Sequence, residues 1–131
     1  FGGLPYGNGH GFENFSGTSY YEIRTATAPY INLQLVRGMH ELTIPKHPKS
    51  PISLIYLDSD HYSSHHVTLK QLAPLVSPGG MIVFHDWTFP EVQKAVHAAL
   101  DLSEFESWNH ENMLDMGALR RKPCSLNKLE G

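Results

Sequence analysis

Residues 52–100 decide the fold; they read ISLIYLDSDHYSSHHVTLKQLAPLVSPGGMIVFHDWTFPEVQKAVHAAL. Residues 52–58 are a near-continuous apolar run, typical of a strand buried on both faces of a parallel sheet, and residues 81–86 repeat the pattern. Apolar residues recur at helical spacing over 63–76 and 90–100. This alternation predicts an α/β fold in which the two strands are adjacent and parallel.

The sequence on either side predicts further elements. The pattern INLQLV at 31–36 predicts another strand, and the stretches at 105–111 and 114–122 predict an antiparallel pair at one edge of the sheet. Residues 1–30 are rich in Gly and predict a loop or lid.

Capping and helix-breaking residues set the bounds of the first predicted helix. Ser63 or Ser64 is placed to cap it. Pro74 or the Ser-Pro-Gly-Gly turn that begins at Ser77 ends it.

Composition narrows the class of protein. The chain has 131 residues, of which 40% are hydrophobic and 18% charged, and this predicts a single domain over 1–131. Its formal charge of -3, without a basic stripe, argues against nucleic acid as a partner. The apolar runs are far shorter than the roughly 20 residues that cross a bilayer, so no membrane partner is expected. With the single Cys124 and no signal-peptide pattern, we expect a cytoplasmic protein.

Four polar residues stand where the two predicted parallel strands end: Asp58, Asp60, His85 and Asp86. Ligands of open α/β sheets bind beyond the carboxyl ends of the strands. Carboxylate oxygens there suit Mg²⁺ or another hard divalent ion. The alternative for Asp58 or Asp60 alone is that one caps the following helix and the other is solvated.

Three histidines follow the acidic pair: His61, His65 and His66. A neutral imidazole is a natural general base for a hydroxyl. His61 is the candidate for that role. For the other two, the polar first turn of a helix is the favoured interpretation.

The order of motifs in 52–100 resembles the second half of a class I S-adenosylmethionine-dependent methyltransferase, most closely the macrocin O-methyltransferase family. The matching elements are a strand into LD-x-D-x-Y, a Pro-Gly-Gly turn, a strand into His-Asp and a helix containing KAV. The segments FGGLP and LVRGMHELTIP also resemble that family. The resemblance implies a three-layer Rossmann-like fold, truncated at the N-terminus and ending in an antiparallel strand pair.

The resemblance also implies roles for residues. Asp58 falls on the family's divalent-metal aspartate and serves catalysis and cofactor binding, and Asp60 falls on the second acidic position. His85 and Asp86 fall on the metal-binding acidic pair, from which His85 departs, and Tyr62 matches the aromatic position on the acceptor side. The cofactor side is implied at Gly38, Met39 and His40. The implied reaction is methyl transfer from S-adenosylmethionine to a hydroxyl of a sugar or other small molecule, assisted by Mg²⁺ or a similar ion.

Two other hypotheses stand beside this one. An apolar strand ending in Asp-x-Asp also marks metal-dependent glycosyltransferases. The third hypothesis is a non-catalytic half-domain that serves as a partner module or is stable only as a homo-oligomer. Because the family's Gly-rich cofactor loop has no counterpart here, residues 1–131 alone are expected to bind S-adenosylmethionine poorly.

Overall fold

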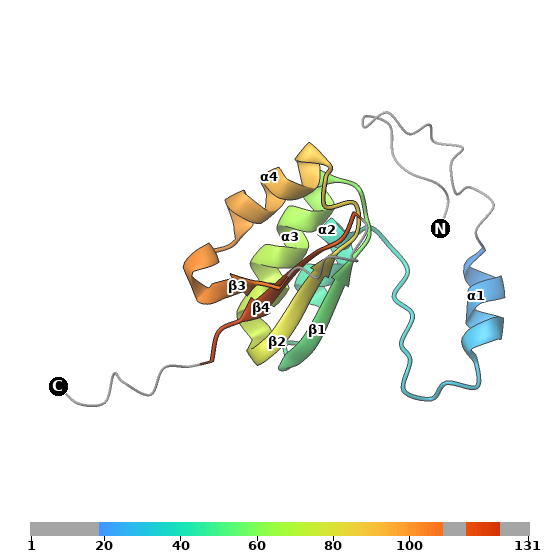
Figure 1. Ribbon diagram of the computed structural model, residues 1–131. Coiled ribbons are helices and arrows are strands. Elements are labelled where there is room, and N and C mark those ends of the chain that lie inside the picture. The colour runs from blue at the N-terminus through green and yellow to red at the C-terminus, as the bar shows by residue number, and fades with distance from the viewer. Residues whose placement is uncertain (1–18, 109–114, 124–131) are drawn as a thin grey trace.

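The computed structural model describes residues 19–108 and 115–123 (Figure 1). Helices and strands alternate along most of the described chain. In chain order they are α1 (Tyr20–Thr27), α2 (His40–Thr43), η1 (Ile44–Lys46), β1 (Ile52–Leu57), α3 (Tyr62–Leu72), η2 (Ala73–Leu75), β2 (Val76–Phe84), α4 (Pro90–Ala99), η3 (Leu102–Glu104), β3 (Phe105–Ser107) and β4 (Gly117–Arg121), where η denotes a 3₁₀ turn.

The strands form one sheet in the order β1-β2-β4-β3. β1 and β2 are parallel, with Ile55 opposite Ile82, as the apolar runs predict. β4 is antiparallel to both β2 and β3, which places the predicted antiparallel pair at one edge. The predicted α/β architecture is confirmed.

β2 begins earlier than predicted. It starts at Val76 rather than at residue 81, so the Ser-Pro-Gly-Gly stretch expected as a turn lies within the strand. A side chain at Gly80 would put its Cβ 2.9 Å from the Ser77 carbonyl oxygen and 3.0 Å from that of Ser53. Glycine therefore lets the backbones of β1 and β2 approach closely where their register shifts.

The hydrophobic core lies between the sheet and helices α3 and α4, which cover one of its faces (Figure 1). Each helix contributes to this core the side chains that recur every three or four residues, and each strand contributes every second side chain. Fully or nearly buried core side chains include Leu57, Leu69, Ile82, Phe84, Val92 and Val96.

The opposite face of the sheet is much more open. Leu54 and Tyr56 of β1 are 58% and 53% exposed, and Met81 and Val83 of β2 are half-buried. These four side chains share one face by register. Among the described residues, therefore, helices and sheet form two of the three layers that the resemblance implies.

The N-terminal part departs from two predictions. Residues 20–27 form α1 rather than a loop, and Glu22 donates its backbone N–H to the Ser19 hydroxyl at 3.4 Å, which caps the helix. The prediction of a strand at 31–36 is wrong. Residues 33–37 pair with none of the described strands, and a strand needs a neighbour to satisfy its backbone groups.

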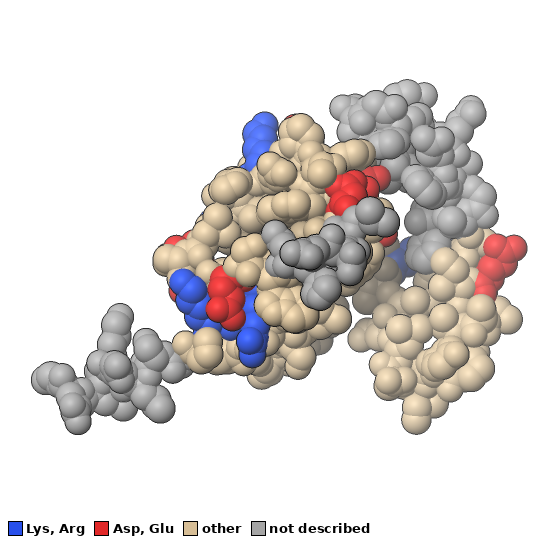
Figure 2. All heavy atoms as spheres, viewed as in Figure 1, with Lys and Arg blue, Asp and Glu red and all other residues tan. Residues whose placement is uncertain are grey.

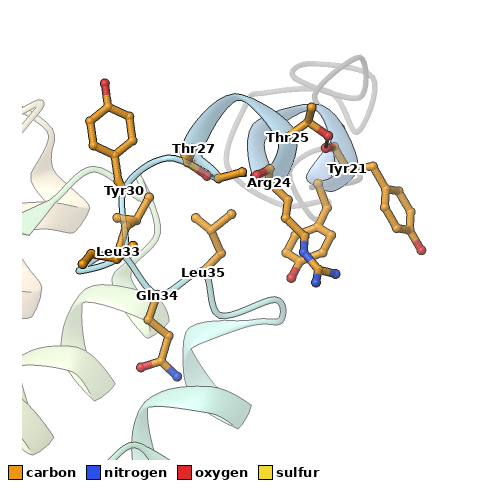
Figure 3. Close-up of a pocket in the computed structure, with 11 residues that line it drawn as sticks. Tyr21, Arg24, Thr25, Thr27, Tyr30, Leu33, Gln34 and Leu35 are labelled. Carbon is orange, nitrogen blue, oxygen red and sulfur yellow. Dashed lines mark hydrogen bonds between the residues drawn. The ribbon is translucent and has the colours of Figure 1, made fainter.

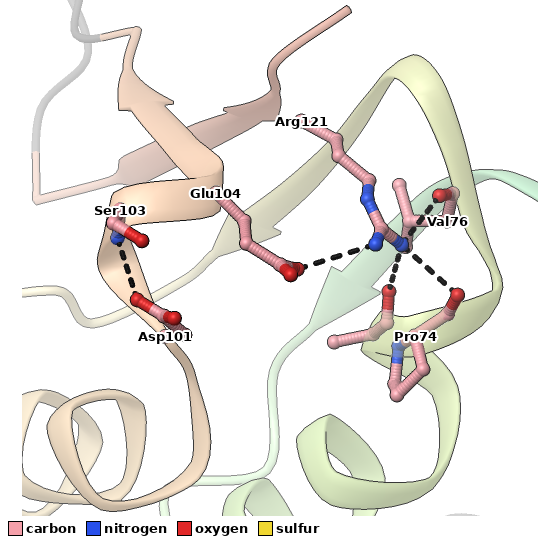
Figure 4. Close-up of polar contacts among 7 residues, drawn as sticks. Pro74, Val76, Asp101, Ser103, Glu104 and Arg121 are labelled. Atoms are coloured by element: carbon pink, nitrogen blue, oxygen red, sulfur yellow. Dashed lines mark hydrogen bonds and ion pairs between the residues drawn. The ribbon is translucent and has the colours of Figure 1, made fainter. Parts of the chain in front are cut away.

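Arg121 ties β4 to the start of β2 (Figure 4). Its Nη1 donates to the carbonyl oxygens of Ala73, Pro74 and Val76 at 3.2, 2.9 and 3.0 Å, and its Nη2 donates to Glu104 at 3.2 Å. The guanidinium thus satisfies carbonyl groups where η2 ends.

Charged side chains of both signs lie together over β3 and β4 on the face shown in Figure 2. Arg120 pairs with Glu106 at 3.7 Å, beside the pair of Arg121 and Glu104. Within the described ranges, no helix has the length and apolar character needed to span a membrane.

Candidate functional site

The first loop, residues 58–61, leads from β1 into α3. Asp58 follows the last strand residue, and Asp60 has a left-handed backbone with a φ of 57°. His61 is the N-cap of α3, whose first residue is Tyr62. The helix therefore begins earlier than predicted, and neither Ser63 nor Ser64 caps it, because the turn at Asp60 already redirects the chain.

The second loop, residues 85–89, leads from β2 into α4. The His85 N–H donates to the Leu57 carbonyl at 2.8 Å, which continues the pairing of the two strands past their ends. Asp86 has a φ of 51°, and its carbonyl accepts from the Phe89 N–H at 2.9 Å. The two loops consequently lie side by side at one edge of the sheet.

Three predicted site residues converge where the loops meet. The Nδ1 atom of His85 lies 2.8 Å from Oδ2 of Asp86 and 3.4 Å from Oδ1 of Asp58. Asp58, His85 and Asp86 each offer one ligand atom, and these atoms lie within 4.8 Å of one another. The side chains of Asp58 and His85 are 52% and 44% exposed, although the Nδ1 atom of His85 itself is buried.

Electrostatics favour a positive charge at this group. The hydrogen bond to Asp86 raises the pKa of His85 above its ordinary value, against the effect of partial burial, and the nearby carboxylates of Asp58 and Asp115 add to the rise. Two carboxylates and an imidazole are groups that commonly serve as ligands of divalent cations. The residues present therefore fit a divalent ion.

The other acceptor-side and base candidates lie in or beside the first loop. Asp60 and His61 are half-buried. The Tyr62 ring stacks on His66 at 5.4 Å between centroids, and Nζ of Lys94 lies 5.2 Å from the Tyr62 centroid. Tyr62 is thus held between α3 and α4.

Of the predicted cofactor-side residues, Asp58 belongs to the group of three, and His40 contacts α3. The Thr68 hydroxyl donates to the Ser64 carbonyl at 2.7 Å, so its oxygen accepts from Nδ1 of His40 at 3.2 Å. Met39 is 54% exposed at the N-cap of α2. Gly38 has a φ of 142°, which favours glycine.

The structure corrects the prediction that His65 lies in a polar first turn of the helix. It is fully buried, and its Nδ1 lies 2.9 Å from the Ser59 hydroxyl and 3.2 Å from the His61 carbonyl. Burial lowers the pKa of His65 and so favours the neutral imidazole. The spacing from residue 65 to Leu69 and Ala73 marks the buried face of α3 and was the available signal.

A hollow beside α1 lies away from this edge. It has a volume of about 850 Å³ and is lined by α1 and the segment after it (Figure 3). Leu35 points toward α1, whereas Tyr30 points away from it. None of its lining residues is a predicted site residue.

The fold and the site together define a class. An open α/β sheet whose parallel strands deliver polar side chains beyond their carboxyl ends is the architecture of the Rossmann-like enzymes. The family model of macrocin O-methyltransferase (TylF) matches residues 29–107, which is more than half of the chain. The chain belongs to this family. The matching family is one of methyltransferases and not of glycosyltransferases, the alternative that the Asp-x-Asp motif left open.

Individual relatives agree with the family match. The chain is 32% identical over 65 residues to the 8-demethyl-8-(2,3-dimethoxy-alpha-L-rhamnosyl)-tetracenomycin-C 4'-O-methyltransferase of Streptomyces olivaceus, over 50% of this chain and 25% of that protein. The solved structure of the O-methyltransferase NovP matches 92% of this chain with a TM-score of 0.71 and 24% identity. A structure of the calicheamicin methyltransferase CalS11 matches 91% with a TM-score of 0.71 and 18% identity.

The match is partial on the side of the relatives. The chain spans 57% of the NovP chain and 56% of that CalS11 chain. At these identities, the structural likeness shows the fold alone.

Proposed function

We propose that this chain serves S-adenosylmethionine-dependent, divalent-metal-assisted O-methylation of a sugar hydroxyl. The observation that carries the proposal is the convergence of Asp58, His85 and Asp86 at the carboxyl edge of the sheet, in a member of an O-methyltransferase family. The sugar is suggested by the relatives: the name of one refers to a rhamnosyl group, and CalS11 is a TDP-rhamnose 3'-O-methyltransferase.

Asp58, His85 and Asp86 would hold the ion. Carboxylates favour Mg²⁺ and Mn²⁺, while the imidazole of His85 shifts the preference toward ions that also accept nitrogen, such as Mn²⁺. When bound, the ion would polarise the acceptor hydroxyl and lower its pKa. The exposure of Asp58 and His85 leaves room for the acceptor oxygen and for water.

The first loop supplies the proton acceptor in this proposal. His61 is the N-cap of α3 in this loop, and its imidazole is the group proposed to take the proton of the hydroxyl. Asp60 and Tyr62 flank it on the acceptor side. The contact of Tyr62 with Lys94 fixes the ring, so that an acceptor meets a rigid wall.

Gly38, Met39 and His40, together with Asp58, are the residues proposed to face the methyl donor. Two polar contacts hold their segment against α3: His40 with Thr68, and the Ser64 hydroxyl donating to Glu41 at 3.3 Å. S-adenosylmethionine, when bound, supplies the methyl group. α3 thus connects the donor side with the acidic edge.

Titration with Mn²⁺, followed by electron paramagnetic resonance, tests the metal site. Asp58→Asn and Asp86→Asn should each weaken Mn²⁺ binding by more than the roughly 10–100-fold typical of losing a residue that only orients a metal ligand. Asp101→Asn is the matched control, because Asp101 is an exposed aspartate at the N-cap of η3, away from the loops. Equal affinity in wild type and Asp58→Asn would remove Asp58 as a ligand.

Methyl transfer itself is measured on the complete gene product, with S-adenosylmethionine labelled in the methyl group and a rhamnoside acceptor. We expect label in the sugar, loss of transfer with a chelator and recovery with Mg²⁺ or Mn²⁺. Transfer that persists undiminished in the chelator would overturn metal assistance. No transfer to any sugar hydroxyl would overturn the proposed activity.

A non-catalytic half-domain is the second candidate, favoured by the open face of the sheet with Leu54 and Tyr56. Large exposed apolar patches often mark contact surfaces. The two candidates differ in outcome. A homo-oligomer that depends on Leu54 and Tyr56 and shows no methyl transfer would support the second.

A further inference from the structure

The second loop has backbone groups that it does not satisfy itself. Its internal hydrogen bond from Phe89 to Asp86 leaves the N–H groups of Trp87 and Thr88 pointing elsewhere. Both donate to one residue: Trp87 to the carbonyl oxygen of Asp115 at 2.9 Å, and Thr88 to its Oδ1 at 3.0 Å. Asp115 therefore holds the two residues that directly follow Asp86.

Packing supports the same contact. The Trp87 ring lies so close to Gly117 that a Cβ there would approach its Cε3 to 2.7 Å. The ring also contacts Phe84, at 5.4 Å between centroids. The indole thus fixes the loop against β4, which lies beside β2 in the sheet (Figure 1).

The backbone of Asp86 explains why outside support matters. A non-glycine residue with a φ of 51° is conformationally costly, and it persists only where the surroundings impose it. Asp115 itself has a φ of 44°. Its carboxylate lies close enough to attract a protonated His85, but it is outside the group of three ligand atoms within 4.8 Å. Its geometry is that of a support and not of a ligand.

We propose that Asp115 is a positioning residue, which holds the second loop so that His85 and Asp86 face Asp58. The inference rests on the proposed function for its consequence, the binding of a divalent ion. It assigns to β4 and the residue pair before it a part in building the acidic edge. The sequence motifs that follow β1 and β2 do not reveal this role of Asp115.

Amide hydrogen exchange tests the support directly and requires no metal. In Asp115→Ala, the Thr88 amide should exchange about tenfold faster than in wild type. A tenfold change is what the loss of one typical hydrogen bond produces. Asp115→Asn keeps an acceptor oxygen and should retain most of the protection. The control is Asp101→Ala, which removes an equivalent bond from the Ser103 N–H to Asp101 Oδ1 at 3.0 Å, drawn in Figure 4, and should leave Thr88 unchanged.

Mn²⁺ affinity tests the consequence. Asp115→Ala should weaken binding by roughly 10–100-fold, Asp115→Asn by much less, and Asp101→Ala not at all. Unchanged exchange at Thr88 in Asp115→Ala would overturn the inference even if Mn²⁺ binds. An Asn variant as weak as the Ala variant would overturn positioning in favour of charge. If wild type binds no Mn²⁺ while the exchange effect is present, the metal part of the proposed function fails and the support of the loop stands.

Discussion

The two loops of the acidic edge present similar residues but are held in different ways. The first is held from within: Ser59 contacts His65, six residues along the chain and fully buried under the loop. The second is held from a neighbouring strand end, because Thr88 donates to Asp115, 27 residues away and exposed. A local sequence window therefore contains the support of the first loop and omits that of the second.

The difference also concerns the physical basis of support. His65 contributes packing: its ring stacks on Phe84 at 6.4 Å, and Nε2 is buried with no hydrogen-bond partner in the described structure. Asp115 contributes hydrogen bonds from a surface position. Removing the first support should therefore cost folding stability, and removing the second should mainly change the shape of the loop.

His65→Ala is expected to have the largest effect. Deleting a buried ring leaves a cavity, and the free energy of unfolding should fall by about 2–4 kcal/mol, measured by urea denaturation. His66→Ala is the control, since His66 is half-buried and stacks on Tyr62 near the surface. An equal loss in both variants would contradict the special place of His65.

Gly117→Ala should break the support of the second loop by packing. The added methyl group collides with Trp87, and forced repacking costs about 1–3 kcal/mol in the free energy of unfolding. In a Trp87→Ala background the same substitution should cost much less, because the collision partner is gone. Additive losses would show that Trp87 is not the cause.

The pH dependence of stability should reveal the buried histidine. Because burial lowers the pKa of His65, the unfolded chain binds a proton near pH 6.5 more readily than the folded chain does. The free energy of unfolding of wild type, relative to His65→Leu, should therefore fall as the pH drops below about 6.5, by at most about 1.4 kcal/mol per unit. The raised pKa of His85 acts in the opposite sense, but it is common to both proteins and cancels in the difference. A parallel pH profile for the two proteins would contradict the prediction.

The smallest effect is expected at the left-handed residue of the first loop. Asp60→Gly should change the free energy of unfolding little, whereas Asp60→Ala should lower it by about 1 kcal/mol, since alanine is disfavoured at a φ of 57°. The same pair of substitutions at Asp86 should give the same ranking. A different ranking at the two positions would show that the loops differ in backbone strain as well as in support.

Much of the fold could be predicted because its signals are local. The apolar runs of β1 and β2 and the spacing of Val92 and Val96 in α4 identify their elements directly. The strand expected at 31–36 failed because a strand also needs a partner, which no local pattern supplies.

The site shows the same division. Asp58, His85 and Asp86 could be placed together because the ends of parallel strands meet at one edge. Asp115 could not, since its contact with Thr88 depends on how β4 aligns with β2. The roles of Asp60, His61 and Tyr62 toward an acceptor stay predictions.

The separation between Thr88 and Asp115 has a consequence for the order of folding. Closing 27 residues costs about 1.3 kcal/mol more in chain entropy than closing six, by the logarithmic dependence of loop closure on length. The first loop can take shape together with the opening turns of α3, while the second must wait until β4 has joined the sheet. During synthesis β4 leaves the ribosome after both loops. A nascent chain that ends before residue 115 thus carries all three candidate ligands but only one of the two supports that hold them in place.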